Sequence, residues 1–461
     1  MAGLVWRVKV VAELEPGIVS ETEVARIERA DLAVPETLGL TLEEGKQLMA
    51  AAQSEIVRAQ VSTVGERFRW CEHCGSKLLS KGHYPATFRS VFGDVDVRIR
   101  RLRACGCRAG EAEQKSFAAM LPTGGVAPEL AYITAKFAAL VPFARVGDLF
   151  AELLPVGGAA NAGTVRNRTM RVGATIATLT AADAPPLEPE AITPAVVVGV
   201  DGGYVRSRHR RPERNFEVIA GKVIDASGTQ HRFAFARNGG AADDFARALV
   251  RAGVRGGTAS TVLSDGDAGL WNLQRTVLPG ATVVLDWFHI AMRFEHVLRA
   301  ATGVGAGTVD AHLGAVARRD TERAKWCLWH GRWQRCLVKL VRTYRWAEAK
   351  CIHDAAGVGT LRRHLKDLID YLEANTHTLV NYGARRRRGE PISTAFVESA
   401  VNEIVSRRMI KKQQMRWNRW TVQPFLDVRA AVLNGTLEGA FRRRYPDFRP
   451  ANHNIETVAA A

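Results

Sequence analysis

The sequence contains no long uninterrupted hydrophobic run. No stretch of its 461 residues approaches the roughly 20 consecutive apolar residues that a membrane-spanning helix requires. The opening segment, MAGLVWRVKVVAELEPG, has only a short apolar run before Glu13 and no signal-peptide cleavage pattern. We therefore expect a cytoplasmic protein that has no part in a membrane.

The sequence also lacks the short motifs of several enzyme classes. It has no Gly-x-Ser-x-Gly elbow of a serine hydrolase and no phosphate-binding Walker loop. The run GVGAG at 303–307 follows a helical pattern rather than a strand, so it does not indicate a dinucleotide site. These absences argue against all three classes.

Acidic residues are few relative to basic ones. There are 47 Asp and Glu against 64 Lys and Arg, which gives a formal net charge of +17. A chain this basic usually binds a polyanion, most often nucleic acid. A basic surface that serves only solubility is the alternative, but clustering of the basic residues favours nucleic acid.

Cysteine is scarce, and its spacing is informative. Four of the seven cysteines form two tight pairs, Cys71-x-x-Cys74 and Cys105-x-Cys107, and the sequence between them reads as a β-hairpin. Two cysteine knuckles on a hairpin supply the tetrahedral ligands of a structural zinc ion. The alternative is four unrelated free thiols, and His73 is expected to be a spectator.

The pattern of apolar residues divides the chain into a multidomain α+β protein. From 195 to 290 it predicts three strands that look antiparallel, then a helix, a strand, a helix and a strand, which is a mixed α/β core. The segments are 1–65 (strand and helix), 66–112 (zinc ribbon), 113–181 (helical, DNA-binding), 182–194 (Pro-rich linker), 195–290 (mixed α/β core), 291–390 (all-helical), 391–425 (amphipathic helix) and 426–461 (C-terminal tail).

Three predicted strands end in an aspartate: Asp201, Asp265 and Asp286. Because parallel strands present their carboxyl ends along one sheet edge, these side chains are expected to converge there. Converging carboxylates stay ionised together only with cations between them, and a pair of magnesium ions would suit phosphodiester chemistry. The alternative for any one aspartate is a strand-end turn or a helix cap.

Other acidic residues nearby are also candidate metal ligands. Asp265 directly follows its strand, whereas Asp267 lies past Gly266 and is expected to cap the next helix. A third carboxylate is expected from the helix FVESAVNEIV, where Glu398 and Glu403 lie on opposite margins of the apolar stripe.

Basic runs flank this region: RSRHRRPER, ARRRRG and RRMIKKQQMRWNRW. Such runs bind phosphates without reading sequence, and interleaved tryptophans add stacking surfaces. The alternative is a set of solvated basic faces with tryptophan in the core. The predicted DNA-binding residues are Arg206, Arg208, Arg210, Arg385, Arg386, Arg387, Arg388, Arg407, Lys411, Lys412, Arg416 and Trp417.

Four motifs together resemble bacterial insertion-sequence transposases of the DDE type, in the ISKra group related to the Mutator-like branch. They are GVDGGYV, LSDGDAGL, LDWFHI and VESAVNEIVSRRM. The resemblance covers most of 60–425 and is most specific over 195–290 and 393–420. It implies a ribonuclease H-like catalytic core interrupted by an all-helical insertion, which 291–390 match in position and character.

The resemblance also implies roles for individual residues. Asp201, Asp265 and Glu398 become the catalytic ligands of two magnesium or manganese ions. Asp286 and His289 match an Asp/Cys-x-x-His motif of the Mutator-like branch and are taken as supporting residues. The zinc ribbon and the helical region after it are similar to terminal-repeat-binding parts of such transposases.

The implied function is transposition in the cytoplasm of a bacterium, in association with the nucleoid. The protein would bind the inverted terminal repeats of its element, cut at the element ends and join the 3′-hydroxyl to target DNA, as a homodimer or larger assembly. A structure-specific nuclease on the same fold and a catalytically retired zinc-ribbon regulator are the alternatives.

Overall fold

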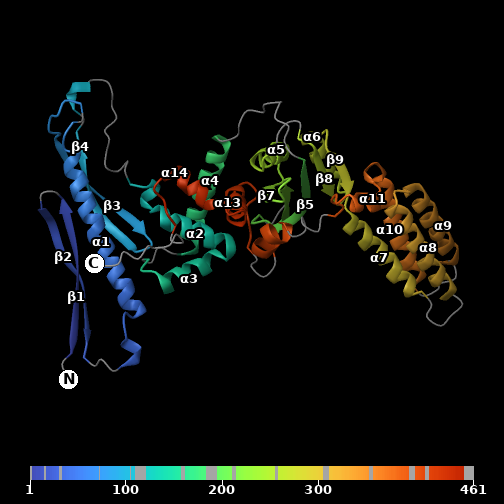
Figure 1. Ribbon diagram of the computed structural model, residues 1–461, viewed down its shortest axis with the longest axis horizontal. Helices are drawn as coiled ribbons and strands as arrows, with labels where there is room; N and C mark the ends of the chain where they lie inside the picture. Colours follow the sequence, from blue (N-terminus) through green and yellow to red (C-terminus); the bar gives the residue numbers. More distant parts are fainter. Residues whose placement is uncertain are drawn as a thin grey trace. The chain divides into compact units, whose positions relative to one another are not determined.

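The computed structural model forms two compact units (Figure 1). One comprises Met1–Ile176 with Gly435–Ala461, and the other comprises Ala177–Asn434. No helix of the described residues is long and apolar enough to cross a membrane. The described residues are 3–14, 17–30, 34–71, 73–103, 105–108, 121–156, 161–182, 195–209, 214–254, 258–304, 311–351, 357–393, 400–410 and 415–450.

The first unit opens with a two-stranded antiparallel sheet, β1 (Leu4–Leu14) and β2 (Gly17–Arg29), followed by helix α1 (Leu42–Arg67). The sequence predicted one strand and the helix, and the second strand was missed. Thr41 and Glu44 form a capping box at the start of α1, because each side chain accepts a hydrogen bond from the other residue's backbone amide.

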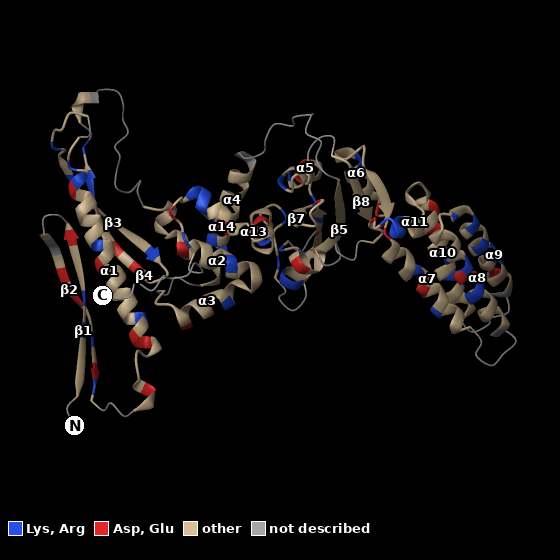
Figure 2. Ribbon diagram, in the orientation of Figure 1, with Lys and Arg blue, Asp and Glu red and all other residues tan. Residues whose placement is uncertain are grey.

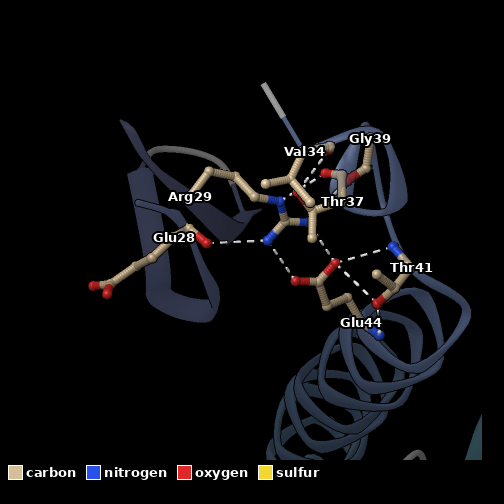
Figure 3. A network of polar contacts seen from close by, with 7 residues as sticks. All are labelled: Glu28, Arg29, Val34, Thr37, Gly39, Thr41 and Glu44. Atoms are coloured by element: carbon tan, nitrogen blue, oxygen red, sulfur yellow. Dashed lines mark hydrogen bonds and ion pairs between the residues drawn. The ribbon is translucent and has the colours of Figure 1, made fainter. Parts of the chain in front are cut away.

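A buried arginine ties β2 to the start of α1 (Figure 3). The Arg29 guanidinium donates to both carboxylate oxygens of Glu44, each at 2.7 Å, and to the carbonyls of Thr37 and Gly39 at 2.8 and 2.9 Å. The hydrogen bond from Arg29, with that from the Thr41 amide, lowers the pKa of Glu44 to about 2. Carboxylate and guanidinium therefore hold the loop between strand and helix.

The predicted β-hairpin is confirmed as β3 (Ser80–Ser90) paired antiparallel with β4 (Gly93–Leu102). Val95, Val97 and Ile99 alternate with exposed residues along β4 and pack with Val57 of α1. Gly93 closes the turn at a φ of 111°, a conformation that favours glycine. The cysteine pairs therefore lie at the open ends of a defined hairpin.

The rest of the first unit is helical, as predicted for the described part of 113–181. The expected tail begins instead with the end of a helix of the second unit, residues 426–433, and continues with a helix of the first unit, residues 437–444. Aromatic residues anchor this second helix, because Tyr132 packs on Phe441 and Phe448 at 5.4 and 5.2 Å between ring centroids. The helices are α2 (Pro128–Leu140), α3 (Phe143–Leu153), α4 (Ala162–Ala182) and α14 (Leu437–Arg444), with short 3₁₀ turns η1 (Pro35–Thr37), η2 (Gly106–Arg108) and η4 (Thr123–Gly125).

The second unit contains a five-stranded mixed sheet with the order β7-β6-β5-β8-β9. β5, β6 and β7 pair antiparallel, whereas β8 and β9 run parallel to β5. This confirms the predicted run of strands and helices. The elements are β5 (Val196–Arg206), β6 (Asn215–Ile224), β7 (Gln230–Ala236), α5 (Ala241–Arg251), β8 (Ser260–Ser264), α6 (Ala268–Val277) and β9 (Thr282–Leu285).

Within the described part of 291–390, the elements are all helices, as the sequence pattern indicated. Its helices share one core with the end of the sheet, in which Leu361, Leu365, Leu368 and Leu372 recur at helical spacing along α10. The helices are α7 (Trp287–Thr302), α8 (Ala311–Trp329), α9 (Trp333–Cys351), α10 (Val358–Ala374), η5 (Thr376–Thr378) and α11 (Tyr382–Arg387).

Two helices close the second unit. The amphipathic helix predicted within 391–425 is described from Ala400 to Ile410, and its main part, η6 (Asn402–Ile410), has π-type hydrogen bonding. After it, α13 (Gln423–Leu433) packs on η6 and β7. The Pro-rich linker at 182–194 lies almost entirely outside the described residues.

Candidate active site

Asp201 lies within β5 rather than at its end, which corrects the sequence prediction. The antiparallel pairing of β5 with β6 continues as far as Arg206, whereas its parallel pairing with β8 stops at Gly199. Asp201 therefore lies just past the residues of β5 that pair with β8, while the other edge of β5 stays paired with β6. At the point where the sequence predicted the end of the strand, only the pairing with β8 ends.

The register places the three predicted aspartates at one level of the sheet. Gly199 pairs with Leu263, so Asp201 and Asp265, two residues further along each strand, occupy equivalent positions. Ser264 pairs with Leu285, so Asp265 and Asp286 are likewise equivalent. Since neighbouring strands lie roughly 4.8 Å apart, the three backbones present aspartates side by side.

All three aspartates belong to one face of the sheet, because side chains alternate along a strand. Val197, Leu263 and Val284, which lie two or four residues before them, pack with the helical segment α7–α11. The residues between, such as Val198 and Val262, pack instead against α5 and α6.

The helix that contains η6 covers the same face beside β5. A Cβ placed on Gly203, two residues after Asp201, would lie 3.2 Å from Val401 and 3.4 Å from Val405. The glycine thus permits a close approach of this helix to the strand next to the aspartate.

Of the neighbouring Asp265 and Asp267, Asp267 takes the predicted position as the cap of α6. Asp267 is the N-cap of α6 and accepts hydrogen bonds from the amides of Gly269 and Leu270, both at 2.9 Å. The Asp265 carboxylate accepts a local hydrogen bond from the Asp267 amide at 3.0 Å. Asp265 is half-buried, and Asp267 is exposed.

Asp286 is fully buried and caps α7, accepting a hydrogen bond from the amide of Phe288 at 2.8 Å. Its other carboxylate oxygen lies 3.6 Å from Nε2 of His289. The Asp286 amide donates to the carbonyl of Ser264, which fixes the end of β9 against β8. One carboxylate oxygen of Asp286 therefore caps the helix, and the other lies beside His289.

Two tyrosines of the helical segment reach the strand ends, and sequence reasoning missed both. The Tyr371 hydroxyl on α10 donates to the carbonyl of Asp265 at 2.7 Å, and the Tyr382 hydroxyl on α11 donates to that of Leu285 at 2.9 Å. Burial raises the pKa of each tyrosine, so both hydroxyls stay protonated donors. The Arg293 guanidinium lies 4.0 Å from the centre of the Tyr371 ring.

Of the two helix glutamates, only Glu403 lies within the described residues; Glu398 lies outside them. Glu403 accepts a hydrogen bond from Nε of Arg232 at 2.7 Å and lies 3.7 Å from Nζ of Lys222. Burial alone would raise the pKa of Glu403, but the bond from Arg232 and the charge of Lys222 lower it. Glu403 is thus held in an ion-pair network with β6 and β7.

The four predicted zinc ligands converge. The sulfurs of Cys71 and Cys107 lie 3.7 Å apart, those of Cys74 and Cys105 lie 3.4 Å apart, and all four lie within 4.8 Å of one another. Four thiolates at 2.3 Å around a tetrahedral zinc would lie about 3.8 Å apart. Within the described part of the chain, no other group of three or more His, Cys, Asp or Glu residues converges in this way.

The first knuckle is a tight turn closed by backbone bonds. The Cys71 amide donates to the carbonyl of Ser76, and Gly75, at a φ of 69°, donates back to the carbonyl of Cys71. Hydrogen bonds from Ser76 lower the pKa of Cys74 to about 6, whereas the neighbouring thiols of Cys105 and Cys74 raise that of Cys107 to about 12. Four thiols this close cannot all ionise without a cation, so the cluster could hold a metal ion.

The predicted DNA-binding residues divide by exposure. Arg385 is buried and paired with Glu390 at 3.0 Å, and Trp417 is 3% exposed with its ring 4.5 Å from that of Phe425. Their burial argues against direct DNA contacts; Trp420 is 73% exposed. The exposed residues are Arg206, Arg208, Arg386, Arg387, Arg388, Arg407 and Arg416, while Arg210, Lys411 and Lys412 lie outside the described residues.

Comparison with known proteins gives little. No protein-family model matches the chain. No curated protein matches it either. Among solved structures, a chain of the Drosophila P element transposase strand transfer complex is similar over 72% of this chain and 85% of that chain, at 12% identity and a TM-score of 0.25. A likeness this low does not establish a shared fold.

Proposed function

We propose that the protein is a DNA transposase of the DDE type, from the ISKra group. It cuts the phosphodiester at the ends of its element and joins the 3′-hydroxyl to target DNA. The observation that carries the proposal is the placement of Asp201 and Asp265 at one level and on one face of neighbouring parallel strands. The strand order supports it, because three antiparallel strands followed by two parallel ones are expected of a ribonuclease H-like core.

The donor set fits two magnesium or manganese ions held by Asp201, Asp265 and Glu398. Two half-buried carboxylates on adjacent strands repel each other, and hard divalent cations with oxygen ligands relieve that repulsion. When bound, such ions supply an activated nucleophile and stabilise the leaving oxygen of an in-line displacement.

The position of Glu398 is supported by the residues on either side of it. The carbonyl of Ile392 accepts a hydrogen bond from the amide of Trp287, the residue after Asp286. Val401, three residues after Glu398, packs at Gly203 beside Asp201. The segment between them thus begins and ends next to the aspartates, whereas Glu403 is engaged by Arg232.

Asp286 and His289 act as supporting residues in this proposal. Asp286 fixes the start of α7 against the ends of β8 and β9, and its carboxylate lies beside His289. The His289 side chain remains 26% exposed, so it can hold a phosphate oxygen near the aspartates. Their task is to hold the backbone and the substrate in place.

DNA recognition is assigned to both units. In the first, a zinc ion held by Cys71, Cys74, Cys105 and Cys107 would fix the hairpin that, with the following helices, binds the terminal repeats. In the second, the exposed arginines bind DNA phosphates near the active site. Because two element ends must be joined together, the active form is a homodimer or larger assembly on DNA.

The two helix glutamates provide a matched test. Glu398→Gln and Glu403→Gln each replace a carboxylate by an amide of the same shape, five residues apart. With magnesium and labelled DNA carrying the element ends, Glu398→Gln should abolish cleavage. Glu403→Gln should lower stability through the loss of its bond to Arg232 while cleavage persists.

Cleavage by Glu398→Gln at the wild-type rate would exclude Glu398 as the third ligand. Cleavage without joining by the wild-type protein would favour the structure-specific nuclease. Specific binding with neither reaction would favour the retired regulator.

A further inference from the structure

One buried carboxylate in the helical segment gathers three arginines. The Asp320 side chain on α8 is 4% exposed, and its Oδ2 lies 2.7 Å from Nη2 of Arg342 on α9. Its Oδ1 lies 3.5 Å from Nε of Arg319 and 3.9 Å from Nη1 of Arg323. The three guanidinium groups are therefore held around a single anion.

This cluster carries more positive charge than the fold requires. Of the three ion pairs, the one with Arg342 joins α8 to α9, whereas Arg319 and Arg323 lie on α8 with Asp320 and add repulsion between like charges. Three guanidinium groups against one carboxylate leave a local excess of two positive charges. An anion from solution would neutralise that excess.

The arginines remain open to such an anion. Their side chains are 56%, 61% and 70% exposed for Arg319, Arg323 and Arg342, although each contacts Asp320. A guanidinium group has five N–H donors, and the contacts to one carboxylate use only a few of them. The donors that point away from Asp320 are available on the surface.

The surroundings are also basic. Residues 311–351, which form α8 and α9, contain ten Lys and Arg residues against three acidic ones, Asp320, Glu322 and Glu348. Lys and Arg positions, coloured blue in Figure 2, occur along both helices. Guanidinium groups match the paired oxygens of phosphate, and the net charge of +17 favours a polyanion over a protein partner.

We propose that Asp320 holds Arg319, Arg323 and Arg342 as a binding site for a backbone phosphate of DNA on the α8–α9 hairpin. This rests on the proposed function only for the identity of the ligand as DNA. The site lies outside the catalytic face and outside the basic runs that the sequence singled out. Asp320 acts by orienting the arginines and does not itself contact the phosphate.

The test compares two double variants of the full chain that remove the same charge. Arg319→Gln/Arg323→Gln removes two arginines of the cluster and leaves the Arg342–Asp320 bridge between the helices. Arg299→Gln/Arg318→Gln removes two exposed arginines of the same helical segment, each paired with its own glutamate, Glu295 or Glu322, four residues away. DNA binding is measured by fluorescence anisotropy without magnesium, over a range of salt concentrations.

The cluster variant should bind DNA on the order of tenfold more weakly than the control variant. The slope of log affinity against log salt should become less steep by about one, as expected for one lost phosphate contact. Asp320→Asn adds positive charge but releases the arginines, so it should also bind more weakly than wild type. Thermal unfolding by circular dichroism checks that each variant is folded.

Equal DNA affinity of the two double variants would overturn the inference, as would tighter binding by a folded Asp320→Asn variant. Polyglutamate serves as an anion without phosphate. If the cluster variant lost as much affinity for polyglutamate as for DNA, the arginines would form a general anion-binding surface, which would contradict the phosphate assignment. After any of these outcomes the proposed function stands if the wild-type protein still binds and cuts DNA. A wild-type protein that binds no DNA refutes the proposed function itself.

Discussion

At the residue scale, Asp265 and Asp267 differ in role although a single glycine separates them. Asp267 accepts hydrogen bonds from two backbone amides of α6. Asp265 lies at the same level as Asp201 on the neighbouring parallel strands β8 and β5. The sequence could predict the cap at Asp267 because a cap depends on local spacing. It could not place Asp201 inside a strand, because that depends on which neighbour each edge of β5 pairs with.

Tyr371 offers a test of how the helical segment positions Asp265. Tyr371→Phe removes the hydrogen bond to the Asp265 carbonyl, a contact that spans 106 residues of sequence. A net loss of about 1 kcal/mol at the strand end that is proposed to bind metal corresponds to roughly fivefold in rate. We expect kcat for DNA cleavage to fall by about this factor and KM to change little.

The matched control is Tyr344→Phe on α9, whose hydroxyl donates to the exposed Glu348. The magnesium concentration for half-maximal activity should rise for Tyr371→Phe and not for the control. Identical magnesium dependence of both variants and wild type would assign Tyr371 to stability alone.

The lowered pKa of Glu44 predicts that the stability of the folded protein depends on pH. Its pKa is about 2 in the folded protein and near 4.5 ordinarily, so its contribution is complete above pH 4.5 and is lost as the pH falls toward 2. Glu44→Gln should lower the melting temperature at neutral pH, and the difference from wild type should shrink through this range. Glu43→Gln, one residue away and exposed, is the control; a gap independent of pH would contradict the assignment.

At the element scale, elements with strong apolar patterns were predictable. The strands of the five-stranded sheet and the helices α7–α11 bury continuous or periodic apolar faces, so their sequences identify them. β2 was missed because its sequence is rich in charge and belongs to a two-stranded sheet with much exposed surface. Tyr371 and Tyr382 were missed because only tertiary contacts distinguish them from core residues.

The cysteine knuckles are the element whose chemistry is simplest to test. We expect the purified protein to contain one zinc ion per chain by elemental analysis, because four thiolates close a tetrahedral site. Cys74→Ser should remove the zinc and lower the melting temperature of the first unit. Cys327→Ser, outside the cluster, should retain the metal. Full zinc content in Cys74→Ser would show that the knuckles are not the site.

At the scale of the whole molecule, the two candidate sites belong to different units of the chain. The cysteine cluster belongs to the first unit, and the three aspartates belong to the second. Residues 435–450 return to the first unit, where Phe441 and Phe448 pack on Tyr132. Sequence patterns could not predict this return, because the partners lie about 300 residues apart and share no local signal.

The most direct test of the account is strand transfer by variants of the two neighbouring aspartates. Labelled DNA carrying the element ends is incubated with target plasmid and magnesium. Asp267→Ala should lose about 1 kcal/mol of stability through its cap and still join DNA. Asp265→Ala should remain folded and form no joined product. Joining by Asp265→Ala at the level of Asp267→Ala would contradict the assignment of the active site.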